Sequence, residues 1–187
     1  KPKAKVKDSL TEAEVSVILA ACRNVREKAI LSLMAYTGIR NQELCNLRVR
    51  DVDFGRNFVN VIAGKGSKDR TVCMSGECAQ VLIKYMSEYP RDASSYLFTT
   101  VRAGAQYTPW AARRLVKNVV ARTGNQKRIH PHLFRHSLAS NMLARGANLL
   151  TIKEQLGHQF IDTTMIYIQC RPQRIQSEYQ MFTPSYI

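Results

Sequence analysis

Apolar residues recur mainly at helical spacing along the chain, and clear end signals mark the helices that they predict. The first helix follows Thr11, because Thr11 and Glu14 have the spacing of a capping box. A second helix is expected over 26–37, with Gly38 as its left-handed cap. One or two further helical turns are expected over 41–47.

The apolar period changes to two after residue 48, which predicts a small antiparallel sheet. Three short strands are expected over 49–54, 58–63 and 70–74, with glycine-containing turns between them. Helical spacing then returns, and it predicts helices over 77–88, from Pro109 to just before Gly124, over 131–145, over 149–156 and from Asp162 onward. The predicted fold class is therefore mainly α with a small antiparallel three-stranded sheet (α+β).

The predicted helix that begins at Pro109 has two distinct faces. Its apolar stripe consists of Leu115, Val116, Val119 and Val120. The opposite face is expected to carry basic residues, namely Arg113, Arg114, Lys117 and Arg122.

The composition is that of a globular domain with an excess of positive charge. The 187 residues include 28 Lys and Arg against 14 Asp and Glu, so the formal net charge is +14. Such a charge makes a polyanion the leading candidate partner. No apolar run approaches the roughly 20 residues that span a bilayer, so membrane insertion and secretion are not expected. The five cysteines are scattered without a CxxC pair, which is typical of reduced, mostly packed thiols in an intracellular protein.

Two clusters in the first half of the chain carry candidate chemistry, although each has a plain structural interpretation. The sequence TGIRNQEL at 37–44 sets Arg40 at a helix start with Glu43 three residues later. Taken alone, this spacing favours a structural ion pair. The sequence GKGSKDR at 64–70 sets Lys65 between two glycines, and it lacks the spacing of a nucleotide-binding loop. Taken alone, it is typical of a solvated basic turn.

Two more clusters follow in the second half. In HLFRH at 132–136, His132 and Arg135 share a helix face, whereas His132 and His136 have the spacing of metal ligands. For His136 we favour a hydrogen-bonded place in the core. The sequence LGH at 156–158 precedes Tyr167, and a tyrosine among isoleucines is usually a core residue.

In this order and spacing, the four clusters together resemble the tyrosine recombinase (phage integrase) family, most of all its Xer-type and mobile-element integrases. The resemblance runs from about residue 10 to Tyr167. It implies a catalytic domain over 10–170, after a basic linker over 1–9 from an N-terminal core-binding domain. Residues 171–187 would form a tail helix that packs either on its own catalytic domain or, exchanged between protomers, on that of a neighbour.

The resemblance also implies a site-specific DNA recombinase or integrase. Such an enzyme cleaves and rejoins DNA through a 3′-phosphotyrosyl intermediate, without metal or ATP. Tyr167 would be the nucleophile, and Lys65 would be the general acid toward the leaving 5′-oxygen. Arg40 and Arg135 would bind the non-bridging phosphate oxygens.

Three further residues receive roles from the same resemblance. His132 would be an acid–base partner of the tyrosine, His158 would hydrogen-bond the phosphate, and Glu43 would brace Arg40. The implied partners are double-stranded DNA and further copies of the chain in a synaptic tetramer. No cofactor, no metal, no membrane and no small-molecule substrate is implied. The implied location is cytoplasmic and nucleoid-associated, with a prokaryotic, viral or mobile-element origin.

Three other classes stay open at this point. They are a type IB topoisomerase, a metal-dependent hydrolase built on His132, His136 and His158, and a regulator that binds DNA without cutting it. The chemistry favours the recombinase, because two planar guanidiniums can each bind equatorial oxygens of a phosphorane in a fork. A two-metal nuclease would instead require clustered carboxylates, which the sequence does not offer.

Overall fold

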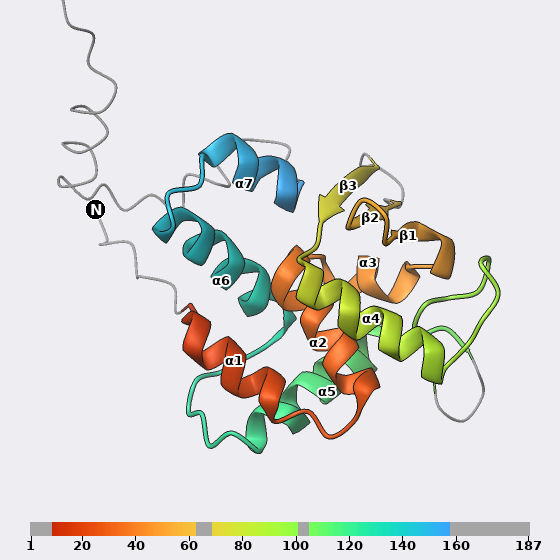
Figure 1. Cartoon of the computed structure of the whole chain (residues 1–187). Helices are drawn as coiled ribbons and strands as arrows, with labels where there is room; N and C mark the ends of the chain where they lie inside the picture. The colour runs from red at the N-terminus through yellow and green to blue at the C-terminus, as the bar shows by residue number, and fades with distance from the viewer. Residues whose placement is uncertain (1–8, 63–68, 101–104, 158–187) are drawn as a thin grey trace, which may run out of the picture.

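The computed structural model describes residues 9–62, 69–100 and 105–157, which form a helical body with a small sheet at one side (Figure 1). The elements follow in the order α1 (Glu12–Ala20), α2 (Val25–Thr37), α3 (Asn41–Asn46), the 3-10 helix η1 (Val49–Asp51), β1 (Val52–Asp53), β2 (Phe58–Val61), β3 (Arg70–Cys73), α4 (Gly76–Glu88), α5 (Pro109–Ala121), α6 (Pro131–Ala144) and α7 (Leu149–Leu156). The predicted fold class is thus confirmed. Most of the linker over 1–9, the helix predicted from Asp162 and the tail over 171–187 lie outside the described residues.

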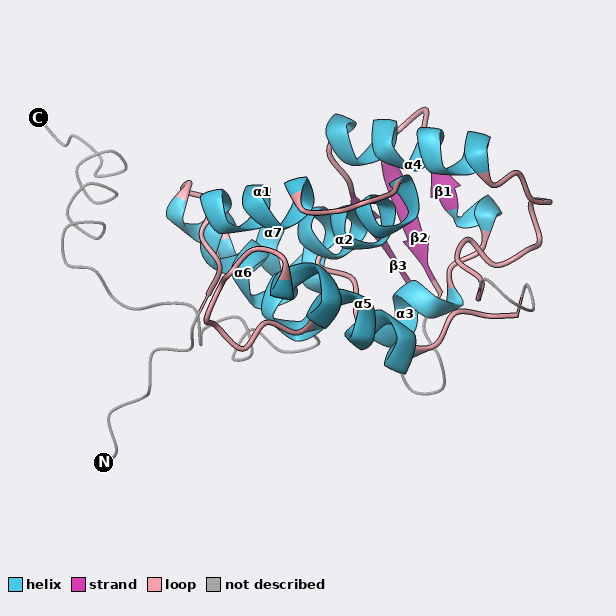
Figure 2. Cartoon of the chain, turned by 90° about the horizontal axis from the view of Figure 1, so that it is seen from below, coloured by secondary structure: helices cyan, strands magenta, loops and turns pink. Residues whose placement is uncertain are grey.

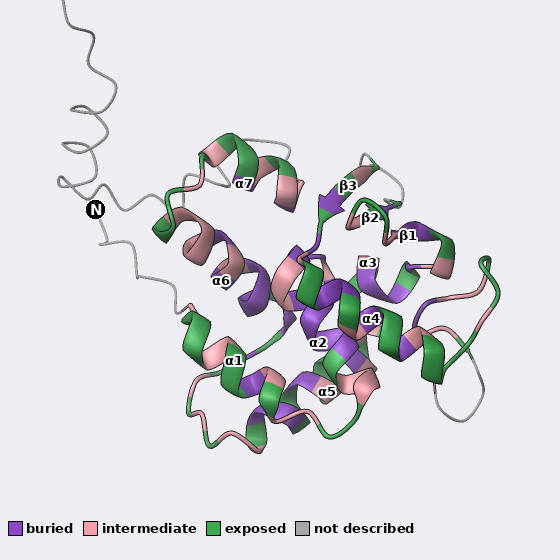
Figure 3. Cartoon of the chain, viewed as in Figure 1, coloured by how far each residue is buried: buried purple, intermediate pink, exposed green. Residues whose placement is uncertain are grey.

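Helix α2 runs through the middle of the molecule and packs against α1, α3, α4, α5 and α6 (Figure 1). Its buried residues lie on several sides of the helix: Ala29, Ile30, Leu31, Ser32, Leu33, Met34 and Thr37. A helix that is apolar around most of its circumference is suited to the centre of a core. Figure 3 shows the same arrangement, with burial concentrated on α2 and on the inward parts of its neighbours. The C-terminal end of α2 is therefore a rigid support for the residues that follow it.

The three strands form an antiparallel meander in the order β1-β2-β3. They lie beside α4, at the side of the molecule away from α1 (Figure 2). Val52 pairs with Val59 and Val59 with Val72, so the buried face of the sheet consists of stacked valines. Strand β3 lies next to α7.

The first predicted strand, over 49–54, is wrong over its first half, because residues 49–51 form η1. The Asp51 carboxylate accepts a hydrogen bond from the Arg48 backbone N–H at 2.8 Å and closes a tight turn. The backbone N–H groups of Val49 and Arg50 donate to carbonyls in the loop after α4, not to a neighbouring strand. These local bonds leave only Val52 and Asp53 for pairing.

The helix ends lie where the sequence predicted them. Thr11 Oγ1 accepts from the Glu14 N–H at 3.2 Å, and Glu14 Oε2 accepts from the Thr11 N–H at 2.9 Å, which completes the capping box. Gly38 and Gly157 are left-handed caps with φ of 63° and 62°. Helix α7 has the predicted bounds.

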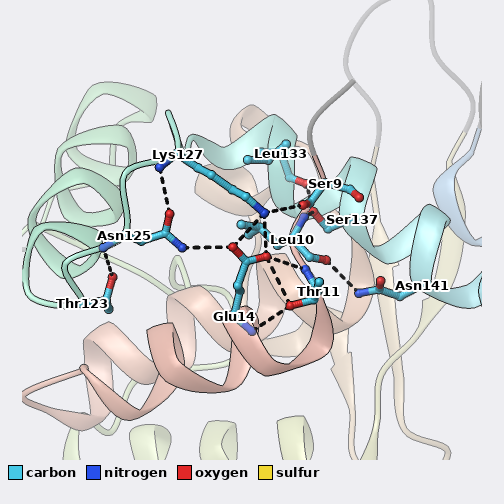
Figure 4. A network of polar contacts seen from close by, with 10 residues as sticks. All are labelled: Ser9, Leu10, Thr11, Glu14, Thr123, Asn125, Lys127, Leu133, Ser137 and Asn141. Atoms are coloured by element: carbon cyan, nitrogen blue, oxygen red, sulfur yellow. Dashed lines mark hydrogen bonds and ion pairs between the residues drawn. The ribbon is translucent and has the colours of Figure 1, made fainter. Parts of the chain in front are cut away.

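A polar network fixes the start of the described chain against α6 (Figure 4). The Leu10 N–H donates to Ser137 Oγ at 2.7 Å, and the Asn141 amide donates to the Leu10 carbonyl at 3.2 Å. Lys127 Nζ donates to the Ser9 carbonyl at 3.1 Å and lies 2.7 Å from a Glu14 oxygen. Helix α6 therefore holds the segment that leads into α1.

One expectation about side-chain exposure needs correction. Arg122 does not face solvent, because its guanidinium donates to Glu27 at 2.6 Å and is half-buried between α2 and the end of α5. The expectation of mostly packed cysteines agrees with the described residues, since Cys45 and Cys78 are buried, Cys22 is half-buried and Cys73 is exposed. Within the described part of the chain, no helix is both long and apolar enough to cross a membrane.

Candidate active site

The described residues include four of the predicted site residues: Arg40, Glu43, His132 and Arg135. Arg40 caps the start of α3, Glu43 lies in its first turn, and the other two lie in the first turns of α6. The remaining three predicted site residues lie outside the described residues: Lys65, His158 and Tyr167.

Arg135 is fixed where the end of α2 meets the end of α7. Its Nη1 donates to the Gly38 carbonyl at 2.8 Å, and its Nη2 donates to the Leu156 carbonyl. Only 5% of the residue is exposed. Glycine suits position 38 because its φ is 63°, in the left-handed region, and because a Cβ there would lie 2.7 Å from Leu156 Cδ2. The Arg135 guanidinium is therefore a preorganised positive charge.

Arg40 also connects the chain after α2 to the end of α7. Its Nη2 donates to the Gly157 carbonyl at 3.3 Å, and its Nη1 donates to Glu43 Oε1 at 2.8 Å. The side chain of Arg40 remains 37% exposed. The two arginines thus converge on residues 38–40 and 156–157, and Arg40 is the more accessible of the two.

Glu43 is shared between two guanidiniums. Besides Arg40, it receives a forked pair of hydrogen bonds from Arg70, with Nη1 to Oε1 at 2.7 Å and Nη2 to Oε2 at 2.8 Å. Burial by itself raises the pKa of this carboxyl. The hydrogen bonds from Arg70 and from the backbone and side chain of Arg40 outweigh it and lower the pKa to about 2. Glu43 is therefore ionised at neutral pH.

His132 is exposed on the first turn of α6, close to the arginines. Partial loss of hydration lowers the pKa of its imidazole, and the positive charges of Arg135, Arg40 and Arg113 lower it further. At neutral pH the imidazole is mainly neutral, so it can accept a proton. Helix α5, which carries Arg113, packs against both α3 and α6.

Gln155 ties α7 to both β3 and α2. Its side-chain oxygen accepts from the Cys73 N–H at 3.0 Å, and its Nε2 donates to the carbonyls of Cys73 at 2.9 Å and Thr37 at 3.2 Å. The side-chain amide pairs with strand β3 as a neighbouring strand would. These bonds fix the position of Gly157, which ends α7.

A comparison with protein families decides the family membership. The model of the "Phage integrase family" matches residues 8–174. The chain belongs to the phage integrase family. The resemblance inferred from the sequence motifs is thus confirmed. Among the curated members, "Tyrosine recombinase XerA" of Pyrococcus horikoshii is 39% identical over 161 residues, which cover 85% of this chain and 55% of that protein. "Tyrosine recombinase" of Pseudothermotoga lettingae is 35% identical over 171 residues, which cover 90% of this chain and 58% of that protein.

Solved structures of other integrase-family members agree with the fold. The crystal structure of XerA recombinase has a TM-score of 0.82 and 33% identity, and the match covers 100% of this chain and 67% of that one. The Tn1549 transposon integrase in complex with transposon right end DNA has a TM-score of 0.77 at 19% identity, which shows the fold alone. The chain spans little more than half the length of the curated relatives.

Three side chains of this integrase-family chain lie at the site although the sequence did not assign them to it: Arg70, Gln155 and Arg113. Arg70 ends the GKGSKDR motif, so the motif itself contained a signal. Its contact with Glu43 spans 27 positions and could not be read from spacing. Gln155 carried no signal, because its role depends on strand β3 lying next to α7.

Proposed function

We propose that this chain is the catalytic domain of a site-specific DNA recombinase or integrase that works through a 3′-phosphotyrosyl intermediate on Tyr167. One observation carries the proposal. Arg135 binds the carbonyls of Gly38 and Leu156, Arg40 binds the adjacent carbonyl of Gly157, and a largely neutral His132 lies beside them. Family membership and the names of the relatives, which are tyrosine recombinases, support the same activity.

The proposed reaction begins when His132 takes the phenolic proton of Tyr167. The phenolate oxygen attacks the scissile phosphorus, and the bond from phosphorus to the 5′-oxygen breaks while Lys65 protonates that oxygen. Arg40 and Arg135 bind the non-bridging oxygens, and His158 donates to the same phosphate. Fixed donors of this kind are each worth about 10²–10³ in rate. The phosphotyrosyl bond retains the energy of the broken linkage, so rejoining needs neither metal nor ATP.

Helix α5 is the surface that we assign to double-stranded DNA. Trp110 is 64% exposed at its first turn, and the Arg114 guanidinium lies 5.3 Å from the Trp110 ring centroid. Arg113 and Lys117 are exposed on the same helix, and the charge of Arg113 reaches His132. A basic helix that packs against α3 and α6 can hold a duplex by its phosphates while the scissile phosphate enters the site.

We further propose that copies of the chain assemble into a synaptic tetramer on DNA and exchange residues 171–187. A groove of about 860 Å³ opens between α1, α2, α4 and α6. Its lining includes the apolar residues Val15, Leu19, Val81, Leu138 and Met142. The tail has apolar residues at helical spacing in the sequence, namely Ile175, Tyr179 and Phe182, which match such a groove in apolar character. We assign the groove to the tail of a neighbouring copy.

The proposed activity is tested with a library of nicked duplexes that contain a randomised segment. After cleavage, the short strand beyond the nick diffuses away and the protein stays attached to DNA. We expect the wild-type chain to become covalently attached to duplexes that share one sequence motif. Tyr167→Phe should form no covalent attachment, although it still binds DNA. Tyr179→Phe is the matched control and keeps the activity. Covalent capture without a sequence preference would instead indicate a topoisomerase, and binding without capture a regulator.

The metal-dependent hydrolase has a separate test. No group of three His, Cys, Asp or Glu side chains in described positions could hold a metal ion. If a chelator abolished covalent capture and a divalent metal restored it, the proposed roles of the arginines would be wrong.

A further inference from the structure

We propose that Arg70 is a positioning residue for Arg40 and acts through Glu43. This inference rests on the proposed function. Arg70 is the first residue of β3, at the base of the hairpin whose turn contains Lys65 in the sequence. It connects that hairpin to the brace of one catalytic arginine and to the end of α7.

The first argument for this role comes from the hydrogen bonds around Glu43. Arg70 binds both carboxylate oxygens, at 2.7 and 2.8 Å. Arg40 binds Oε1 through Nη1 at 2.8 Å and Oε2 through its backbone N–H at 2.8 Å. With both oxygens held by Arg70, the carboxylate binds only one Nη of Arg40.

Loss of Arg70 changes what Glu43 can do. A carboxylate and a guanidinium prefer a forked pair of parallel hydrogen bonds. Without Arg70, Glu43 is able to turn and take both Nη groups of Arg40. Arg40 would then leave the Gly157 carbonyl, which it now contacts at 3.3 Å, and turn away from the phosphate.

The second argument comes from the packing of Arg70 against Gly157. A Cβ on Gly157 would lie 2.3 Å from Arg70 Cδ and 2.5 Å from Arg70 Nε, so the Arg70 stem lies directly on the backbone at the end of α7. The next residue in the sequence is His158. Arg70 therefore contacts both sides of the junction that Arg40 bridges.

The burial of Arg70 argues against a role in stability alone. Only 11% of its side chain is exposed, and its buried Nε has no hydrogen-bond partner among the described residues. A buried donor without a partner is unfavourable, and apolar residues of similar volume often replace buried ion pairs without loss of stability. A strict geometric requirement at Glu43 explains why an arginine occupies this position.

The test compares two DNA substrates that differ in the charge of the scissile group. One is a nicked duplex with an ordinary phosphate. The other carries a methylphosphonate, in which a methyl group replaces one charged non-bridging oxygen. Loss of a residue that positions Arg40 for charge neutralisation should slow cleavage of the first substrate much more than cleavage of the second. Loss of a residue that only stabilises the fold should slow cleavage of both substrates equally.

We expect Arg70→Met to slow single-turnover cleavage of the phosphate about 10²-fold, in the range of a lost fixed donor. On the methylphosphonate we expect a loss of only a few-fold, as for Arg40→Ala. The double variant Arg70→Met/Arg40→Ala should cleave no more slowly than Arg40→Ala, because both changes remove the same contribution. Arg122→Met is the matched control, since it breaks another partly buried pair, with Glu27, and should show no substrate dependence.

Arg70→Lys keeps the charge and the stem but not the fork, so it covers the case in which Arg70→Met fails to fold. We expect an intermediate loss with the same substrate dependence. The proposal is overturned if Arg70→Met loses activity equally on both substrates, if its loss multiplies with that of Arg40→Ala, or if Arg70→Lys cleaves like the wild type. Failure of the proposed function is distinct from these results, because the wild type would then attach to neither substrate.

Discussion

Replacement of Glu43 by glutamine should destabilise the fold in a way that depends on pH. The carboxylate lies 2.8 Å from Arg40 and 2.7 Å from Arg70, and 11% of its side chain is exposed. Its pKa falls from an ordinary 4.5 to about 2 on folding. That difference corresponds to about 3 kcal/mol of stability at neutral pH. The loss of one partner from a buried ion pair typically costs about 3–5 kcal/mol, which agrees.

The sign of the pH dependence follows from the direction of the shift. The folded pKa of Glu43 is below the unfolded one, so the ionised carboxylate contributes its full stabilisation above pH 4.5. The contribution is lost as the pH falls from about 4.5 toward 2. The free energy of unfolding of Glu43→Gln should therefore be about 3 kcal/mol lower than that of the wild type at pH 7, and nearly equal to it near pH 2.

Urea unfolding followed by far-UV circular dichroism at several pH values measures this difference. Circular dichroism is preferable to fluorescence, because the single tryptophan, Trp110, is 64% exposed and reports poorly on the core. Glu88→Gln, at an exposed position at the end of α4, is the matched control and should leave stability unchanged. A difference below about 1 kcal/mol at pH 7, where exposed ion pairs lie, or one that does not change with pH, would refute the reasoning.

Three further predictions follow from the proposed chemistry. Lys65→Ala should slow cleavage about 10²–10⁴-fold, because the leaving 5′-oxygen loses its proton donor. A sulfur in place of that bridging oxygen leaves as a thiolate without a proton, so it should restore the rate of Lys65→Ala but not that of Arg40→Ala, and rescue of Arg40→Ala would contradict the assignment. With a net charge of +14, the logarithm of DNA affinity should fall steeply with the logarithm of salt concentration, by about 0.9 per phosphate neutralised, in a filter-binding titration; a nearly flat dependence would argue against phosphate contacts. Deletion of 172–187 should weaken cooperative assembly on DNA, measured by gel shift, more than single-site binding; equal losses would exclude an assembly role for the tail.

Local signals predicted much of the fold. The Thr11–Glu14 capping box and the glycine caps at Gly38 and Gly157 act within a few residues, so spacing alone located the helix ends. Expectations failed where distant segments compete for the same groups. The strand expected from residue 49 became a 3-10 helix, because the loop after α4 accepts its N–H groups. Arg122 does not lie on the solvent face of the helix, because its guanidinium forms an ion pair with Glu27.

The candidate site could likewise be predicted from the sequence only in part. Arg40, Glu43, His132 and Arg135 were predicted from short motifs that follow one another along the chain. The sequence could not predict how they meet, because the contacts join residues 38–40 to 156–157. Arg70 escaped prediction for the same reason, since its partner Glu43 belongs to another element.

The most direct test of the proposed function identifies the residue that carries the DNA. After covalent capture on a nicked duplex, nuclease trimming and trypsin digestion, mass spectrometry locates the peptide with the remaining nucleotide. Trypsin does not cut between Arg171 and Pro172, so the expected peptide covers 154–174 and contains Tyr167 as its only tyrosine. The rival Tyr179 falls in the separate peptide 175–187. We predict a 3′-linked nucleotide on peptide 154–174. A nucleotide on 175–187, or one linked through its 5′-phosphate, would contradict the proposed mechanism.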